Sequence, residues 1–106
     1  MVVGTQQRDS LAGAVGMLKA LASPVRLAAV VELSIGPRCV HELQAAFRAK
    51  GREVSQPLLS QHLKVLRSAG VVTATRRASE ITYQLADAHV GHIVHAAIRQ
   101  AKEEQA

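Results

Sequence analysis

The stretch LADAHVGHIVHAAIRQAKEE, residues 85–104, contains the densest group of metal-ligating side chains in the sequence. One carboxylate and three imidazoles, Asp87, His89, His92 and His95, occupy nine consecutive positions of a largely aliphatic segment. Histidine nitrogens and carboxylate oxygens are ligands of zinc and of similar divalent metals. The same residues also fit a simpler interpretation, in which Asp87 caps a helix and the histidines form its polar side.

Helical spacing limits how this group could bind an ion. On a helix with about 3.6 residues per turn, His89, Gln100 and Glu103 lie on nearly the same face. His89 and Gln100 are nevertheless roughly 16 Å apart along the axis, too far for one ion whose bonds are about 2 Å long. An antiparallel copy of the helix from a second chain would bring Asp87 and His89 against positions 100 and 103, making two symmetric sites between the chains.

Gln100 is the weak point of this arrangement, because a neutral amide is a poorer zinc ligand than an imidazole. Either the site is weakened, or water or another residue completes it, or metal binding has been lost. His92 lies three residues from His89, and His95 lies three residues from His92, so each pair could share an ion on a helix. The candidate metal ligands are Asp87, His89, His92 and Glu103.

A second group of polar residues accompanies a leucine stripe in SQPLLSQHLKVLRSAG, which runs from Ser55 to Gly70. Four leucines recur at helical spacing and predict the buried side of a helix. Glutamine can pair with adenine in the major groove of DNA, while serine, lysine and arginine can reach bases or phosphates. A solvated polar face is the other interpretation of this helix. The predicted DNA contacts are Gln56, Ser60, Gln61, His62, Lys64 and Arg67.

After Gly70 the apolar period changes to two. The segments VVTATRR and EITYQL bracket a short RAS turn and predict a β-hairpin over residues 71–85. Arg76 and Arg77 fall at its tip, where guanidinium groups could lie along phosphates or enter a minor groove. A charged edge that prevents strand aggregation is the alternative.

Composition supports a small domain with an anionic partner. The 106 residues fit a single domain, and a domain of this size is often stabilised by association, so a dimer is expected. There are 13 Lys and Arg against 8 Asp and Glu, a formal charge of +5 that favours nucleic acid. With Cys39 as the single cysteine, an intrachain disulfide is excluded, and we expect an intracellular protein.

The elements that must position these residues are mostly helices. Ser23 can cap a helix that has Pro24 at its first position, where the missing N–H costs nothing. The hydrophobic spacing predicts helices near 10–22, 24–34, 39–48 and 56–69, a hairpin wing over 71–85 and a last helix over 87–105. This order, α-α-α-α-β-β-α, describes one mainly helical winged helix-turn-helix domain over residues 1–106.

Several stretches in this order resemble the ArsR/SmtB family of small, metal-responsive bacterial repressors. They are LKALASPVRLAAVVEL, CVHEL, VSQPLLSQHLKVLRSAGVV, ITYQLAD and the terminal histidine-containing helix, and they cover about residues 17–104. The resemblance implies a homodimer paired through its first and last helices. It also implies binding to a palindromic double-stranded operator, which is released when an inducer, commonly a metal ion, binds.

The resemblance also sharpens the choice of metal. Family members with a zinc site on the last helix resemble this chain at Asp87, His89 and Glu103, whereas a histidine is usual at the position of Gln100. Zinc is the expected ion, with nickel or cobalt as further candidates; a metal-independent regulator whose last helix only dimerises is the alternative. The second family site is represented by Cys39 alone, which we interpret as a buried small hydrophobe.

One segment departs from the family pattern. RAKGREV, between Phe47 and Ser55, makes this connection several residues longer than is usual and adds Arg48, Lys50 and Arg52 beside the predicted recognition helix. These cations could contact phosphate or form a solvated loop.

Other classes of protein find little support. No nucleophile–base constellation or phosphate-binding loop is visible, so an enzyme is not expected. No apolar run approaches the roughly 20 residues that span a bilayer, and the first ten residues lack the order of a signal peptide. We therefore expect a cytoplasmic protein without a membrane partner.

Overall fold

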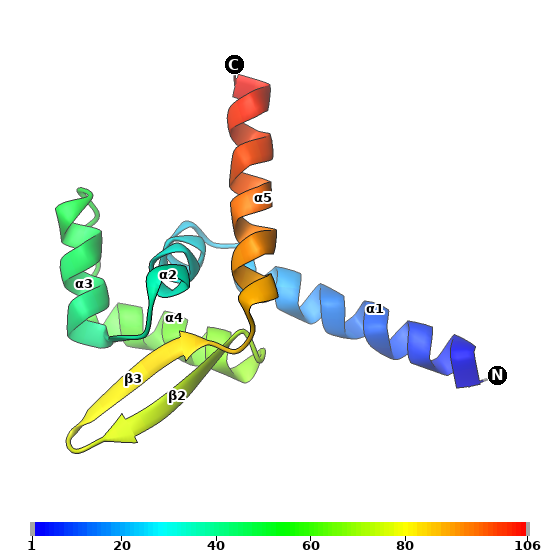
Figure 1. Ribbon diagram of the computed structural model, residues 1–106, viewed down its shortest axis with the longest axis horizontal. Helices are drawn as coiled ribbons and strands as arrows, with labels where there is room; N and C mark the ends of the chain where they lie inside the picture. The colour runs from blue at the N-terminus through cyan, green and yellow to red at the C-terminus, as the bar shows by residue number, and fades with distance from the viewer. Residues whose placement is uncertain (1, 106) are drawn as a thin grey trace.

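The computed structural model describes residues 2–105, with side chains from Asp9 onward. The elements are α1 (Val2–Leu21), α2 (Pro24–Ile35), β1 (Arg38–Cys39), α3 (Val40–Ala49), α4 (Gln56–Ser68), β2 (Val72–Arg77), β3 (Glu80–Leu85) and α5 (Ala88–Gln105). Helices α2, α3 and α4 and the hairpin gather together, whereas α1 and α5 extend away from them in different directions (Figure 1).

The start of α2 follows directly from a capping residue. The Ser23 hydroxyl accepts from the Arg26 backbone N–H at the start of α2, and Pro24 occupies the first turn. Helix α1, in contrast, begins at Val2 and runs through the predicted start near residue 10. The segment before Ser10 contains no proline and includes glutamine and arginine, which are good helix formers, so no residue there stops the helix.

The core consists of aliphatic side chains around one aromatic ring. Phe47 of α3 is buried together with residues from α2, α4, the start of β2 and α5. The largest fully buried side chains besides Phe47 are Leu43, Leu59, Leu63, Leu66, Val30, Val71, Val72 and Val94. Of the four leucines predicted to form the buried side of α4, Leu58 is 45% exposed, and the other three, Leu59, Leu63 and Leu66, fix which side of that helix faces solvent.

The sheet has three antiparallel strands in the order β1-β3-β2. In the hairpin, Val72 pairs with Leu85 and Arg77 with Glu80. Strand β1 was not predicted: we assigned Cys39 to the start of a helix, but it pairs with Thr82 of β3. Cys39 is also the residue that precedes α3, and its backbone N–H donates to the Glu42 carboxylate at 2.8 Å. A capping residue has extended backbone, which lets it end a strand as well.

Glycines fix the course of the chain at two places. Gly70 has φ 77°, and hydrogen bonds from Gly70 N–H to Arg67 O and from Val71 N–H to Leu66 O end α4 and turn it into the hairpin. At Gly91, an added Cβ would lie 3.3 Å from Ser34 Cβ, so α5 crosses α2 at close range. No single helix within residues 2–105 is both long and apolar enough to cross a membrane.

Candidate nucleic-acid interface and candidate metal centre

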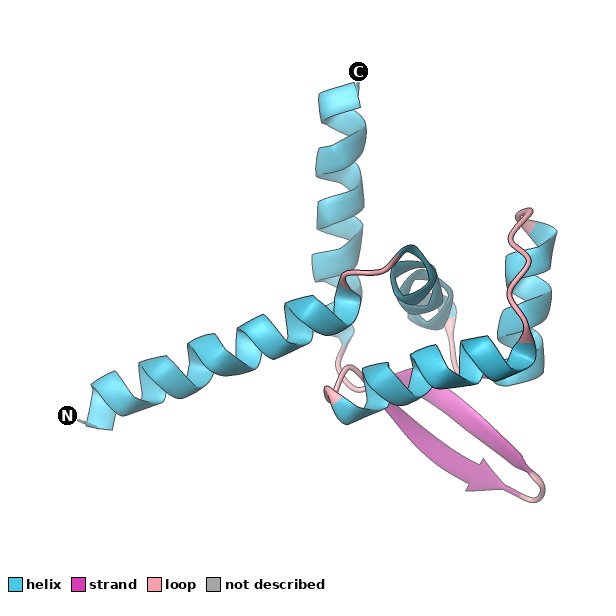
Figure 2. Cartoon of the chain, turned by 180° about the vertical axis from the view of Figure 1, so that it is seen from behind, coloured by secondary structure: helices cyan, strands magenta, loops and turns pink. Residues whose placement is uncertain are grey.

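The polar side of α4 is exposed because the opposite side is locked into the core. The Ser55 hydroxyl accepts from the Leu58 backbone N–H and starts the helix, while Leu59, Leu63 and Leu66 are buried. Five of the six predicted contact residues on this helix are consequently exposed: Gln56, Ser60, Gln61, Lys64 and Arg67. Viewed from behind, α4 lies along the surface with the hairpin beside it (Figure 2).

His62 is placed differently from the other five. It is half-buried, and its Nδ1 lies 3.1 Å from Nη1 of Arg26 on α2. Because a guanidinium can only donate hydrogen bonds, His62 Nδ1 accepts from Arg26 and carries no proton, so the ring is neutral in this contact. Burial, and then the positive charge of Arg26, lowers the pKa of His62. Arg26 is itself held by a hydrogen bond from its Nε to Ala20 O. His62 therefore faces α2 rather than the exposed side of α4.

Two hollows border the exposed side of α4. Towards the hairpin, Gln56 and Ser60 line a hollow with Ile81 and Tyr83 of β3. On the other side, Gln61 and Lys64 line an open groove of about 750 Å³ that also includes residues of α1. The polar side of α4 therefore lies between the hairpin and α1, with room for another molecule on both sides.

The two arginines of the hairpin tip point to opposite faces, because successive side chains of a strand alternate. Arg76 is paired with Ile81 and shares the face of Val72, which packs against the helices. Arg77 is paired with Glu80 and lies on the other face. Both arginines are exposed, and neither takes part in an ion pair between residues 9 and 105.

Asp87 and His89 form a pair at the start of α5. One carboxylate oxygen, Asp87 Oδ1, accepts from the His89 backbone N–H at 2.7 Å and lies 2.6 Å from His89 Nδ1. The backbone hydrogen bond, and then the ring contact, lower the pKa of Asp87. The Asp87 carboxylate holds the His89 ring through Nδ1. His89 Nε2 and Asp87 Oδ2 are therefore the atoms of this pair that remain available to coordinate a metal ion.

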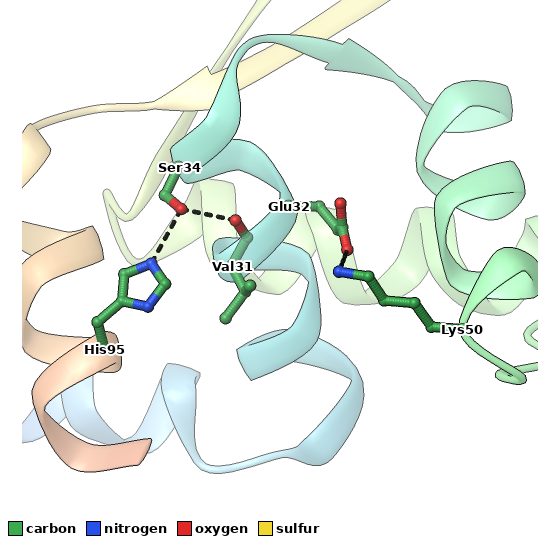
Figure 3. A network of polar contacts seen from close by, with 5 residues as sticks. All are labelled: Val31, Glu32, Ser34, Lys50 and His95. Carbon is green, nitrogen blue, oxygen red and sulfur yellow. Dashed lines mark hydrogen bonds and ion pairs between the residues drawn. The ribbon is translucent and has the colours of Figure 1, made fainter. Parts of the chain in front are cut away.

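The other two histidines of α5 differ in their surroundings. The ring centroid of His92 lies 6.2 Å from that of His89, with the two rings at 89°. His95 Nε2 lies 3.1 Å from the Ser34 hydroxyl, which donates to Val31 O (Figure 3). His95 is thus directed at α2, whereas His92 remains beside the Asp87–His89 pair.

Glu103 of the same chain does not lie near Asp87, His89 and His92. It lies 14 residues after His89, roughly 21 Å along the axis of a helix. Within the described residues, no three His, Cys, Asp or Glu side chains are grouped so as to hold a metal ion. One chain therefore brings together Asp87, His89 and the neighbouring His92 and leaves Glu103 on the far part of α5.

The sequence did not indicate the partner of Lys50. Lys50 Nζ lies 2.5 Å from Oε2 of Glu32, a carboxylate on α2 that is only 4% exposed (Figure 3). Arg48 pairs with the exposed Glu53 instead. A signal was present, because Glu32 stands alone in the apolar run AAVVEL, but its cation comes from a distant loop and could not be identified.

Part of the apolar surface of the chain is uncovered. Leu11, Val15 and Leu18 of α1 are 67%, 50% and 54% exposed, and their spacing of four and three residues puts them on one face. Ile93 of α5 is also exposed. Two projecting helices with exposed apolar side chains are expected to pack against another molecule.

Comparisons with known proteins agree with this architecture. Residues 23–74 match the family model described as "Bacterial regulatory protein, arsR family". The chain is 50% identical over 97 residues to the HTH-type transcriptional repressor SmtB of Mycobacterium tuberculosis H37Rv, covering 92% of this chain and 68% of the relative.

Two solved structures extend the similarity to three dimensions. The transcriptional repressor BigR from Xylella fastidiosa superposes with a TM-score of 0.71 at 33% identity, covering 91% of each chain. The homodimeric winged helix-turn-helix DNA-binding domain Mb0332 from Mycobacterium bovis has a TM-score of 0.78 at 26% identity, covering 94% of this chain and 88% of the other. The predicted fold, mainly helical with a β-hairpin wing, is confirmed.

Proposed function

The chain belongs to the arsR family of bacterial regulatory proteins, and we propose that binding of a divalent metal ion releases it from its operator. Zinc is the ion that we propose first. It is a DNA-binding transcriptional repressor of the ArsR/SmtB type and not an enzyme. It binds operator DNA, and it does so as a homodimer. The predictions of the ArsR/SmtB family, of operator DNA as a partner and of a homodimer are therefore confirmed.

The exposed side of α4 is the proposed reading surface. Gln56, Ser60 and Gln61 can reach base edges, and Lys64 and Arg67 can reach bases or phosphates. The exposed polar strip between two hollows supports this assignment, because a helix can enter the major groove only if nothing beside it blocks the approach. Arg76 and Arg77 would contact the backbone or an adjacent minor groove from the wing.

The donor atoms near the start of α5 fit a metal only in part. An imidazole nitrogen and a carboxylate oxygen are good zinc ligands, and the Asp87 contact holds the His89 ring in one orientation. Among the described residues, however, one chain brings together too few donors. In the proposed site, Asp87 and His89 of one subunit, with His92 beside them, are completed by Glu103 of the second subunit. Bound zinc would supply a strong cross-link between the two subunits.

Linkage explains how such a site would regulate DNA binding. The two α4 helices of a dimer must match successive major grooves, so a metal that favours another dimer geometry weakens operator binding. The effect is reciprocal, and the operator must weaken metal binding by the same factor. The single observation that carries the proposal is the Asp87–His89 pair, held at 2.6 Å on an exposed helix start.

Isothermal titration of the purified dimer with zinc chloride tests the proposal. We expect saturable binding tighter than micromolar, weakened at least about tenfold in His89→Ala because an imidazole ligand is lost. Gln100→His should tighten binding by restoring an imidazole at a position that faces the second subunit. His95→Ala is the matched control: it removes an imidazole from the same helix, but one that contacts Ser34, and should leave zinc binding unchanged.

Zinc binding weaker than micromolar, or equal in wild type and His89→Ala, would reject the metal site. The protein would then be a metal-independent repressor whose last helix serves only dimerisation. Parallel titrations with nickel and cobalt chloride determine which ion the site prefers.

A further inference from the structure

A hollow of about 410 Å³ lies between α2, the connection from α3 to α4, and α5. Its apolar wall comes from α2 and α5, with Leu27, Val31 and Ile98 all partly buried. Of the four charged residues at its rim, two come from the basic connection that departs from the family pattern, one from α2 and one from α5. The lining residues are Pro24, Leu27, Ala28, Val31, Glu32, Lys50, Arg52, Ile98 and Lys102.

The charges around this hollow do not balance. Three cations, Lys50, Arg52 and Lys102, surround one carboxylate, Glu32. That carboxylate is buried and already paired with Lys50. Among the ion pairs between residues 9 and 105, none includes Arg52 or Lys102. Two positive side chains next to an apolar wall are therefore available to an anion.

The basic connection is directed away from the proposed DNA surface. Lys50 reaches back to α2, and Arg52 lies in the same hollow as two residues of α5. Neither residue lines the hollow or the groove beside α4. In Figure 1 the C-terminal end of α3 points away from the hairpin. Contact with DNA phosphates, which the sequence allowed, does not account for these cations.

The hollow also lies away from the apolar surface of α5. Lys102 is nine residues from the exposed Ile93, and at about 100° per residue these side chains lie on opposite sides of the helix. A second subunit that packs on Ile93 leaves the side of α5 with Ile98 and Lys102 open.

We propose that this hollow binds an organic anion, a carboxylate with an aliphatic chain, as a second effector of the repressor. Arg52 and Lys102 hold the carboxylate by charge-assisted hydrogen bonds, and the chain packs on Leu27, Val31 and Ile98. A volume of about 410 Å³ is within the range of small-molecule sites. The ligand fills a hollow shared by α5, which extends from the fold, and by the connection leading to α4.

The regulatory part of this proposal rests on the proposed DNA surface, because the occupied hollow ties α5 to the connection that begins α4. A ligand with different affinity for the two dimer geometries changes operator affinity by that difference. Ligand binding itself is measured without DNA. If octanoate binds in the hollow but does not change the affinity of the protein for its operator, the proposed regulation is rejected, whereas the proposed binding site is retained.

The test is isothermal titration of the full-length dimer with sodium octanoate. We expect saturable binding that is weakened at least about tenfold in the double variant Arg52→Gln, Lys102→Gln. Arg48→Gln is the matched control, since Arg48 belongs to the same basic segment but pairs with Glu53 outside the hollow. It should bind octanoate like the wild type. Acetate and inorganic phosphate should bind more weakly, because neither fills the apolar wall.

Three results would overturn the proposal. They are no saturable octanoate binding, equal octanoate binding by the wild type and the double variant, and equal binding of octanol and octanoate. Thermal unfolding of each variant verifies that it is folded. If the double variant is unfolded, Leu27→Gln tests the apolar wall instead, with weaker octanoate binding expected.

Discussion

Helices α4 and α5 both begin at a capping side chain and both bury one apolar strip, yet their polar sides are completed in different ways. The Ser55 hydroxyl accepts from the Leu58 backbone N–H at the start of α4, and the Asp87 carboxylate accepts from the His89 backbone N–H at the start of α5. The polar side of α4 is bordered by the hairpin and by α1 of its own chain. On α5, Asp87 and His89 are in contact, but Glu103 lies too far along the helix to join them within one chain.

This difference separates the two surfaces proposed to be functional in the repressor. The α4 surface needs only its own chain, so each subunit can present it whatever the second subunit does. The proposed metal site exists only where two α5 helices meet. If the proposed metal site regulates the α4 surface, it must do so through the dimer geometry, and the first substitution below disrupts the dimer.

The largest effect is expected from a charge placed on α1. Leu18→Glu puts a carboxylate into the exposed apolar strip of Leu11, Val15 and Leu18, which we expect to be covered in the dimer. The chain should remain folded, because Leu18 is not part of the core, but the dimer should dissociate. Loss of the second half-site contact should weaken operator binding on the order of 100-fold. Light scattering and gel-shift titration measure the two effects.

Ile35→Glu is the control for this substitution. Ile35 is exposed by 68% at the end of α2 and is as apolar as Leu18, but it belongs to neither projecting helix. The variant should remain a dimer. A Leu18→Glu variant that is still dimeric and still binds its operator would show that α1 is not part of the subunit interface.

The next effect concerns the two parts of the proposed DNA surface, α4 and the wing. Gln61→Ala should weaken the specific operator by about 1–3 kcal/mol and leave non-specific DNA nearly unchanged, because a base contact is lost. Arg76→Ala should weaken both kinds of DNA and reduce the slope of log affinity against log salt by about 1, because a phosphate contact is lost. Gel-shift titration at several salt concentrations separates the two outcomes.

Arg77→Ala provides the comparison for the wing. Arg76 and Arg77 carry the same charge at the same tip but lie on opposite faces of the hairpin. If only the face packed towards the helices approaches DNA, the salt slope changes for Arg76 and not for Arg77. Equal salt slopes for the wild type and both variants would remove the wing from the DNA surface.

The fold was largely predictable because its signals are local. The leucine stripe of α4, the serine caps and the alternation in the hairpin each act within a few residues. The errors came from competition between local options. Cys39 could begin a helix or extend a strand, and its pairing with Thr82 depends on a strand more than 40 residues away. The start of α1 was predicted near residue 10 but lies at Val2, because no residue before Ser10 stops the helix.

The candidate sites were predictable to the extent that one helix contains them. Six candidate contact residues on α4 were proposed from a single periodic stretch, but periodicity could not show that one of them, His62, turns towards Arg26. The pairing of Glu32 with Lys50 was likewise invisible, since it joins two elements through the tertiary fold. The proposed metal site could not be located from one chain for a stronger reason: Glu103 lies roughly 21 Å along the helix from His89, so it could join Asp87 and His89 only across two chains.

The smallest expected effect is a pH dependence that arises where α4 meets α2. The pKa of His62 is lowered from 6.5 in the fold by burial and by Arg26, whereas an unfolded chain has no such shift. Below pH 6.5 the unfolded state therefore binds more protons than the folded state, and the stability contributed by neutral His62 is lost as the pH falls through the folded pKa. The melting temperature of the wild type should therefore fall as the pH is lowered from 7.5 to 5.0.

The variant His62→Gln tests this origin of the pH dependence, because glutamine keeps an acceptor for Arg26 but does not titrate. Its melting temperature should fall less over the same pH range. The other four histidines are present in both proteins. Identical pH dependence in the two proteins would mean that the Arg26–His62 contact does not hold α4 in place. The exposed side of α4 would then be positioned by its leucine stripe alone.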